Sequence, residues 1–221
     1  MKTETRQTST DWLKRDIDFV LALCGLVLLT PAFLVIALII KLGSRGPVFY
    51  RGTRVGRHGR LFDIFKFRTM VTGAEKMGGP STADDDPRVT KVGRFLRKRK
   101  LDELPQLLNI LKGEMSFVGP RPEVSYYVNM FTDEEKQILN VRPGITDWAS
   151  LWNSDEGAIL AGSEDPEKTY MEKIRPTKLH LQLEYVRHHS LQTDFKILLQ
   201  TLGLIVFKIR PDLMPRLEGK V

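Results

Sequence analysis

Two adjacent acids, Asp102 and Glu103, stand directly after a stretch that carries seven cations and no acid. These cations are Arg88, Lys91, Arg94, Arg97, Lys98, Arg99 and Lys100. Pro105 follows the acids, and because proline is accepted in the first turn of a helix but not deeper, we expect the acids at a helix start. Free backbone N–H groups and crowded cations suit a carboxylate that handles phosphate, directly or through a metal. The simpler alternative is a pair of acids that cap the helix.

Three further cations are candidates for contacts to phosphate. Lys66 and Arg68 alternate with phenylalanines in residues 61–68, so a strand would place both cations on one face. Arg121 lies between two prolines, which favour an extended backbone and aim the guanidinium in a fixed direction. The triple acid Asp84-Asp85-Asp86 is a weaker candidate for a metal site, since a solvated loop is the commoner explanation.

Composition restricts the partner without naming it. The 221 residues carry a net charge of +7 and are 42% hydrophobic, which is not a disordered composition. The basic balance favours an anionic partner, namely nucleic acid, a phospholipid surface or a phosphorylated substrate. A single cysteine, Cys24, excludes an internal disulfide framework.

One stretch indicates a membrane. From Phe19 to Ile40 there are 22 residues without a charge, which at about 1.5 Å per residue can just cross a hydrocarbon core of about 30 Å. Pro31 lies in the middle and deprives the Val27 carbonyl of its helical donor, and the preceding Thr30 hydroxyl is placed to bond back to it. Thr30 and Pro31 therefore mark a predicted break in the helix.

Cations on both sides of this stretch argue against a simple crossing. Lys14 and Arg15 precede it, and six cations follow it with no acid between positions 41 and 62: Lys41, Arg45, Arg51, Arg54, Arg57 and Arg60. Because cations favour the cytoplasmic side, both ends are expected there. We predict a flexible segment 1–13, a re-entrant membrane hairpin 14–41 and a cytoplasmic catalytic domain 42–221. A kinked crossing helix, a cleaved signal peptide and a buried core helix are the alternatives.

The remaining pattern predicts a mainly helical α/β domain with a short β-hairpin. Residues 47–50 and 61–68 read as strands around a turn at 57–60, and residues 72–87 as a loop. A basic amphipathic helix is expected over 88–100, with Val89, Val92, Phe95 and Leu96 as its apolar stripe. A short apolar helix over 104–111, a strand-like run over 115–122 and helices over 133–140, 175–188 and 191–209 follow.

Taken together, these blocks resemble the bacterial sugar transferases, the monotopic phosphoglycosyl transferases. The resemblance runs from Lys14 to about Ile209. It rests on Gly46–Arg51, Lys66–Met70, Asp86–Thr90, Leu101–Gln106, Gly113–Ser116, Val118–Glu123 and Arg142–Thr146. It implies an enzyme of the bacterial inner membrane, on its cytoplasmic face, that moves a sugar-1-phosphate from a nucleotide sugar, usually a UDP-sugar, to polyprenyl phosphate and releases UMP. The reaction starts the assembly of a lipid-linked glycan.

The resemblance also assigns roles. It makes Asp102 the nucleophile that forms a phosphosugar-aspartyl enzyme, and it implies Mg²⁺ with Asp102 as metal ligand. Glu103 assists as base or magnesium partner, and spacing does not decide between the two. Lys66, Arg68, Arg97 and Arg121 match basic positions that contact phosphate, whereas Arg142 matches a turn on the nucleotide side. The implied partners include membrane phospholipid and not nucleic acid, and a homodimer is a candidate assembly.

Two departures set this chain apart from the common family pattern. The Pro-Gly-Ile-Thr turn is usually followed by glycine, but here by Asp147, and the Asp-x-x-Tyr pattern before the last helix reads Gln182-Leu183-Glu184-Tyr185. A differently built nucleotide or sugar pocket is the expected consequence. The rival function is a membrane-tethered basic scaffold that binds acidic lipid or nucleic acid without catalysis.

Overall fold

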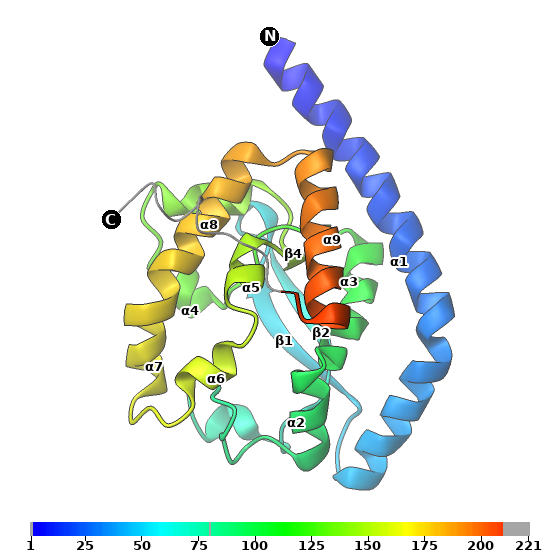
Figure 1. The fold of residues 1–221 in the computed structure, drawn as a ribbon, viewed down its shortest axis with the longest axis vertical. Helices are drawn as coiled ribbons and strands as arrows, with labels where there is room; N and C mark the ends of the chain where they lie inside the picture. The colour runs from blue at the N-terminus through cyan, green and yellow to red at the C-terminus, as the bar shows by residue number, and fades with distance from the viewer. Residues whose placement is uncertain (1, 80, 210–221) are drawn as a thin grey trace.

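A long helix and a twisted hairpin form the frame of the molecule in our computed structural model, which describes residues 2–79 and 81–209. Helix α1 (Lys2–Gly43) leads into strands β1 (Phe49–Val55) and β2 (Leu61–Phe67), which pair antiparallel around the short turn η1 (Arg57–Gly59). Figure 1 shows α1 along one side of the domain, with the hairpin at its centre. The predicted hairpin is confirmed.

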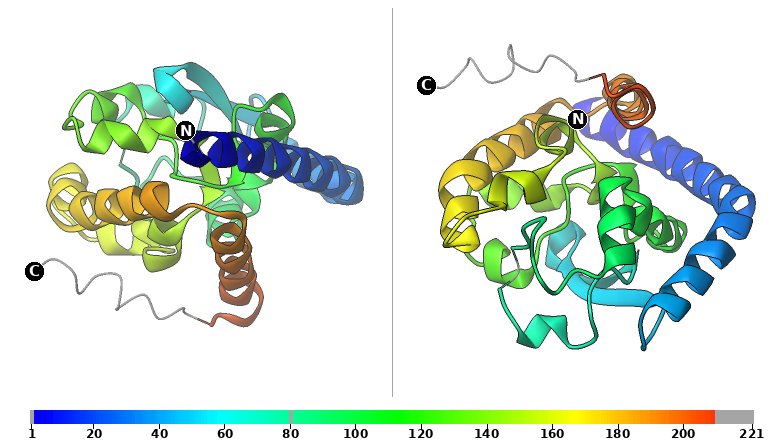
Figure 2. Two further views of the ribbon diagram at one scale, coloured as in Figure 1. Left: turned by 90° about the horizontal axis from the view of Figure 1, so that it is seen from above. Right: turned by 60° about the horizontal axis from the view of Figure 1, so that its bottom comes forward.

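Helix α1 differs from the predicted helix-break-helix in detail. It stays helical through Thr30 and Pro31, yet it changes direction and curves around the domain (Figure 2, right). The Thr30 hydroxyl donates to the Leu26 carbonyl at 2.7 Å, one residue before the Val27 carbonyl that we expected. A threonine hydroxyl that bonds four residues back bends a helix, so the predicted break is a bend. Residues 2–13 belong to the same helix, and their flexibility stays a prediction.

Both halves of α1 pack on the domain. In the first half, Ala22 joins a buried cluster with Leu107 and Ile110. In the second half, Ile36 and Ile40 pack with Phe67 and Leu96. The rest of α1 is largely exposed: its segment Asp11–Gly43 is long and apolar enough to cross a membrane, and in an apolar stretch of 18 residues within it 11% is buried.

A basic helix and a tight turn lead from the hairpin to the acids. After the turn η2 (Ala74–Lys76), helix α2 (Lys91–Lys98) starts at Thr90, whose hydroxyl accepts from the Gly93 N–H at 2.9 Å. It is shorter than the predicted helix over 88–100, because Lys100 adopts a left-handed conformation with φ of 56°. Phe95, predicted in the apolar stripe, is 57% exposed. The 3-10 turn η3 (Leu101–Gln106) and helix α3 (Leu107–Lys112) follow.

The second half of the domain is built on two short strands and a layer of helices. Strands β3 (Ser116–Val118) and β4 (Gly144–Thr146) pair in parallel, joined by α4 (Ser125–Val128) and the 3-10 turn η4 (Glu135–Asn140). Next come α5 (Trp148–Trp152), α6 (Glu156–Leu160), α7 (Pro166–Thr169), the π-helical turn η5 (Tyr170–Ile174), α8 (Arg175–His188) and α9 (Leu191–Phe207). Trp148, Leu181, Tyr185 and Ile197 form the largest part of the core here.

Candidate active site

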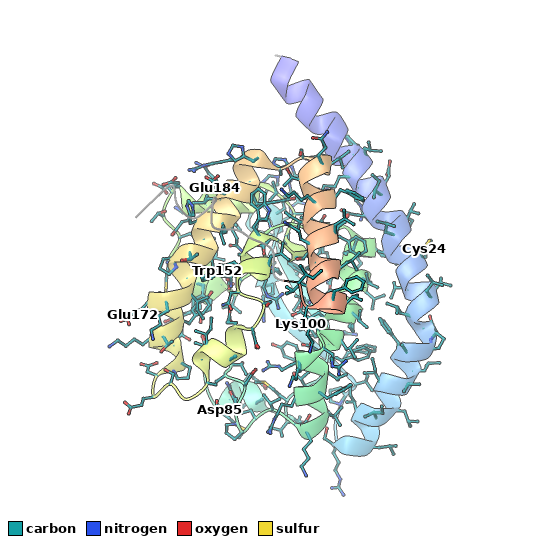
Figure 3. All side chains as sticks on the ribbon, viewed as in Figure 1. Cys24, Asp85, Lys100, Trp152, Glu172 and Glu184 are labelled. Carbon is teal, nitrogen blue, oxygen red and sulfur yellow. The ribbon has the colours of Figure 1, made fainter. Side chains whose placement is uncertain are left out.

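The two acids are held between the hairpin and the end of the basic helix. Turn η3 packs against β2, and the left-handed Lys100 before it directs the chain from α2 into the turn; Figure 3 labels this residue. Both acids are buried: Asp102 is 6% exposed, and the Glu103 side chain is 12% exposed. Pro105 fits because the chain at this point is a 3-10 turn, one of the tight connectors that precede helices.

Glu103 is fixed by two cations from different elements. Lys66 on β2 donates to Glu103 Oε1 at 2.9 Å. Arg121 donates through Nη1 to Oε2 at 3.0 Å and through Nη2 to Oε1. Burial by itself would raise the pKa of the Glu103 carboxyl, yet the charges and hydrogen bonds of Arg121 and Lys66 hold this pKa well below its usual range. We call these three side chains the Glu103 clamp.

Asp102 has the opposite surroundings. Its carboxylate accepts no hydrogen bond from the residues that the structure describes, although it lies in the field of the clamp. Burial raises the pKa of Asp102, an effect that the Lys66 charge opposes and the neighbouring Glu103 charge reinforces. A buried carboxylate without hydrogen bonds is weakly solvated, so its oxygens are free to attack an electrophile or to contact a metal.

A third cation approaches Asp102 from the basic helix. The Arg97 guanidinium is half-buried, and its charge acts on Asp102 and on Asp86. The Arg97 side chain makes no hydrogen bond or ion pair within the described ranges, so its donors are available to an anionic ligand. Lys66 is less free, and burial lowers the pKa of its ammonium group.

The backbone just before Arg121 is held by hydrogen bonds to β4. The Gly119 N–H donates to the Thr146 carbonyl at 3.0 Å, and the Gly144 N–H donates to the Pro120 carbonyl at 3.0 Å. The side chain of Arg121 is 34% exposed, so it can face solvent and clamp Glu103 at once. The site thus brings together Asp102, Glu103, Lys66, Arg97 and Arg121.

Two predicted substrate contacts lie elsewhere. Arg68 donates to the carbonyls of Ser44 and Arg45 at 2.9 and 2.8 Å, so its guanidinium holds the junction between α1 and the hairpin. Arg142 donates from Nε to the Gly113 carbonyl at 3.2 Å and lines a hollow beside the first half of α1. Burial, aided by the Arg57 charge, lowers the pKa of Arg142.

The acidic loop does not form a metal site. Within residues 2–79 and 81–209, no group of three or more His, Cys, Asp or Glu side chains is arranged to hold a metal ion. Asp86 binds Arg88 at 2.7 Å, and Asp85 accepts from the Gly162 N–H at 3.3 Å. Both acids therefore serve the loop. Asp102, by contrast, has free oxygens of the kind that Mg²⁺ uses when substrate phosphates complete its shell.

A buried triad behind Arg121 escaped sequence reasoning. Lys178 on α8 lies 2.5 Å from Glu123 Oε1 and donates to the Tyr170 hydroxyl at 3.1 Å. Although burial acts to lower the pKa of Lys178, the Glu123 charge raises it above its ordinary value. The triad ties the segment of Arg121 to α8. One signal was available: Lys178 interrupts the buried face of a helix, where a lysine needs an acidic partner.

Comparison with known proteins identifies the family of this chain. The profile described as "Bacterial sugar transferase" matches residues 9–208, which is most of the chain. The chain belongs to the bacterial sugar transferase family. The matched range includes the apolar segment of α1 and every residue of the site.

Curated members of the bacterial sugar transferase family match over nearly the same range. The UDP-glucose:undecaprenyl-phosphate glucose-1-phosphate transferase of Escherichia coli is 39% identical over 199 residues, which cover 86% of this chain and 39% of that protein. A UDP-N-acetylgalactosamine-undecaprenyl-phosphate N-acetylgalactosaminephosphotransferase of Aeromonas hydrophila is 36% identical, over 88% of this chain and 44% of its own length. The chain thus spans less than half of these relatives. It covers 84% of the exopolysaccharide production protein ExoY of Sinorhizobium fredii, at 35% identity.

The two departures from the common pattern of this family contact each other. Gln182 Nε2 donates to Asp147 Oδ2 at 3.3 Å, and both residues are fully buried. The other oxygen of Asp147 accepts from the Ser150 N–H at 2.7 Å and starts helix α5. Asp147 and Gln182 thus form a buried pair of one carboxylate and one amide that joins the start of α5 to α8.

Proposed function

We propose that this chain transfers a sugar-1-phosphate from a nucleotide sugar, with UDP as its nucleotide, to polyprenyl phosphate and releases UMP. The supporting observation is that the two acids have different surroundings. Lys66 and Arg121 donate to Glu103, whereas the neighbouring Asp102 is buried and its carboxylate accepts no hydrogen bond from the described residues. The names of the Escherichia coli and Aeromonas relatives include a UDP-sugar and undecaprenyl phosphate, which supports the donor and the acceptor.

The reaction has two displacements at one phosphorus. An oxygen of Asp102 attacks the sugar-bearing phosphorus, and the bond from this phosphorus to the oxygen bridging the two phosphates breaks, so UMP leaves with that oxygen and its electron pair. A phosphate oxygen of the polyprenyl phosphate then attacks the same phosphorus, and Asp102 leaves as a carboxylate. The product is a polyprenyl diphosphate sugar, and the enzyme returns to its initial state.

The cations of the site offset the repulsion between anions. Lys66, Arg97 and Arg121 surround Asp102 with positive charge, which stabilises the charge on the transferring group. Glu103 keeps Lys66 and Arg121 in place, so we propose that it positions these two cations. The sequence also leaves open that Glu103 acts as a base or as a magnesium ligand. Mg²⁺, with Asp102 as its protein ligand, would neutralise charge on the diphosphate.

The membrane places the acceptor within reach. We propose that α1 enters the bacterial inner membrane from the cytoplasm and returns to the same side. Its support is that Ala22 in the first half and Ile40 in the second both pack on one domain, and that cations flank the apolar segment on both sides. The lipid phosphate can then approach Asp102 from the bilayer and the nucleotide sugar from the cytosol.

The test is UMP release from UDP-sugars by the purified protein with polyprenyl phosphate and Mg²⁺. Without the lipid, one equivalent of UMP and a phosphosugar adduct on Asp102, seen by mass spectrometry, are expected. Asp102→Asn should abolish both, and UMP release that survives this change would refute the nucleophile. Arg97→Met should lower kcat/KM at least tenfold, as loss of a charged phosphate contact implies, whereas Arg94→Met, an exposed cation on the same helix, should not.

The rival scaffold predicts a different result. A basic protein that only binds acidic lipid would release no UMP from any nucleotide sugar, yet it would still bind anionic vesicles. Removal of Mg²⁺ with a chelator gives an independent check, because it should stop turnover while membrane association persists.

A further inference from the structure

Lys14 on the membrane helix takes part in a closed ring of contacts inside the domain. Its ammonium group donates to the Val118 carbonyl at 3.0 Å and lies 2.5 Å from Asp194 Oδ2 on α9. The Tyr185 hydroxyl on α8 donates to Asp194 Oδ1 at 2.7 Å and to the same Val118 carbonyl at 3.2 Å. The side chain of Lys14 is only 16% exposed. It therefore faces the domain rather than lipid headgroups.

The ring ends three residues before Arg121, and the chain between them is rigid. Val118 is held by Lys14 and Tyr185, and the next two residues are held by backbone hydrogen bonds to Thr146 and Gly144. A Cβ atom added to Gly144 would lie 2.1 Å from the Gly119 nitrogen, so the two backbones are in close contact. The contact of Lys14 with Val118 is therefore joined by a hydrogen-bonded segment to Arg121, whose guanidinium clamps Glu103.

Arg15, the next residue of α1, holds the other side of the clamp. Its Nη1 donates to the Ile110 carbonyl at 2.5 Å, and its Nη2 donates to the Leu111 carbonyl at 2.8 Å. These carbonyls belong to the last turn of α3, and the Ile110 carbonyl also accepts from the Gly113 N–H at 2.9 Å. Helix α3 follows directly on η3, which carries Asp102 and Glu103. Neighbouring cations of one helix thus grip the two segments that meet in the Glu103 clamp.

We propose that Lys14 and Arg15 are positioning residues that set the geometry of the Glu103 clamp, so that the membrane helix is part of the active-site framework as well as an anchor. The proposal rests on the proposed function only for its effect on turnover. In the structure, Lys14 couples α1 to residues 116–121, and Arg15 couples it to residues 107–114. A shift of α1 in the bilayer changes the distance between Arg121 and Glu103.

Hydrogen exchange of the full chain in nanodiscs tests the structural part without any substrate. Lys14→Met should speed exchange in residues 116–121 about tenfold, since it removes a charged hydrogen bond there. Arg15→Met should do the same in residues 107–114. Asp194→Asn opens the ring from outside α1 and should reproduce the Lys14→Met pattern even if that variant inserts poorly. Arg45→Met, an exposed cation beyond the other end of α1, is the matched control and should change neither segment.

Turnover tests the catalytic part. Lys14→Met should lower kcat/KM about tenfold in the natural background and cause no further loss in an Arg121→Lys background, because a residue that acts through Arg121 is not additive with it. Additive losses, or faster exchange spread evenly over the domain, would overturn the proposal. If no nucleotide sugar is turned over, the proposed function fails, and the exchange pattern still decides whether α1 is coupled to the clamp.

Discussion

Asp102 and Glu103 have the same carboxyl chemistry and adjacent positions, but their surroundings move their pKa values in opposite directions. Glu103 receives two cations from separate elements, and Asp102 receives burial without hydrogen bonds. The difference between their pKa values comes from their surroundings alone. In pairs of acids with divergent pKa values, one carboxylate can be held in place while the other reacts. The consequences can be measured on stability as well as on turnover.

Asp102→Asn should stabilise the protein at pH 7. Because burial raises the pKa of Asp102 in the folded state, ionisation of this group costs stability as pH rises above about 4, the ordinary pKa of aspartate. The uncharged asparagine avoids that cost. The apparent Tm in detergent should therefore increase by roughly 2–4 °C for each kcal/mol relieved, and the gain should vanish below pH 4. A lower Tm at pH 7 would show that Asp102 is held by contacts absent from this structure.

Glu103→Gln should have the opposite effect. The depressed pKa of Glu103 contributes stability above its ordinary value of about 4.3, which is lost as pH falls through the folded pKa. Removing this charge deprives the largely buried Lys66 and the partly exposed Arg121 of the carboxylate that both contact, which costs at most about 3–5 kcal/mol. Denaturant unfolding at pH 7 should show this loss, and the gap to the natural protein should narrow below pH 4. An equal gap at all pH values would contradict the clamp.

The contact between Asp147 and Gln182 predicts a dependence between two substitutions. Gln182→Asp alone adds a second carboxylate beside Asp147 in a buried position, one methylene further back than the Gln182 amide, and neighbouring buried carboxylates resist ionising together. We expect a Tm several degrees lower. Asp147→Asn combined with Gln182→Asp restores one carboxylate and one amide and should recover most of the loss. Independent, additive effects in thermal unfolding would exclude the compensation.

Motifs were enough to single out the acids and the cations Lys66, Arg97 and Arg121, which the structure places together; their roles stay a prediction. Motifs were not enough for Arg68, which shares the strand face with Lys66 in the pattern but binds the carbonyls of residues 44 and 45. Lys66 and Arg68 have different partners because of the path that the chain takes from α1 to the hairpin. A local sequence pattern cannot predict this path. The ring around Val118 was hidden for the same reason, since its members come from four distant elements.

At the scale of elements, two devices set the direction of the site residues. The left-handed Lys100 ends α2 early and starts η3, so the acids face β2. The parallel pair β3–β4 fixes Arg121. Periodicity predicted the hairpin, α8 and α9. The helix it predicted over 88–100 is longer than α2. It did not predict the parallel pair, because three-residue strands are too short to show an alternating pattern.

Gly144→Ala should damage the β3–β4 pair. The added Cβ atom would lie 2.1 Å from the Gly119 nitrogen, a backbone atom that cannot move away easily. We expect a loss of about 1–3 kcal/mol from overpacking and a fall in kcat as Arg121 shifts. Gly203→Ala on α9 is the control, since nothing lies within 4 Å of its added Cβ and alanine favours a helix by about 1 kcal/mol. Equal stability changes in the two variants would refute the close-packing argument.

At the scale of the whole molecule, α1 and the domain form one unit. The helix contributes buried residues to two clusters on either side of its bend, and its Lys14 and Arg15 donate to the carbonyls of Val118 and Ile110 in the domain. Its outer side, with Cys24, points away from the domain (Figure 3). A straight crossing would put Ala22 or Ile40 on the far side of the bilayer from the domain that it packs against.

Cysteine labelling tests this topology directly. In a Cys24→Ser background, Trp12→Cys and Leu42→Cys place thiols at the two ends of the apolar segment, where the natural side chains are 72% and 79% exposed. Met77→Cys, at a side chain that is 64% exposed, reports the side of the domain. A membrane-impermeant maleimide should leave all three unlabelled in intact spheroplasts and label all three after lysis. Labelling of Trp12→Cys alone in intact spheroplasts would mean that α1 crosses the membrane once, and the bend at Thr30 and Pro31 would then be a kink within a crossing helix.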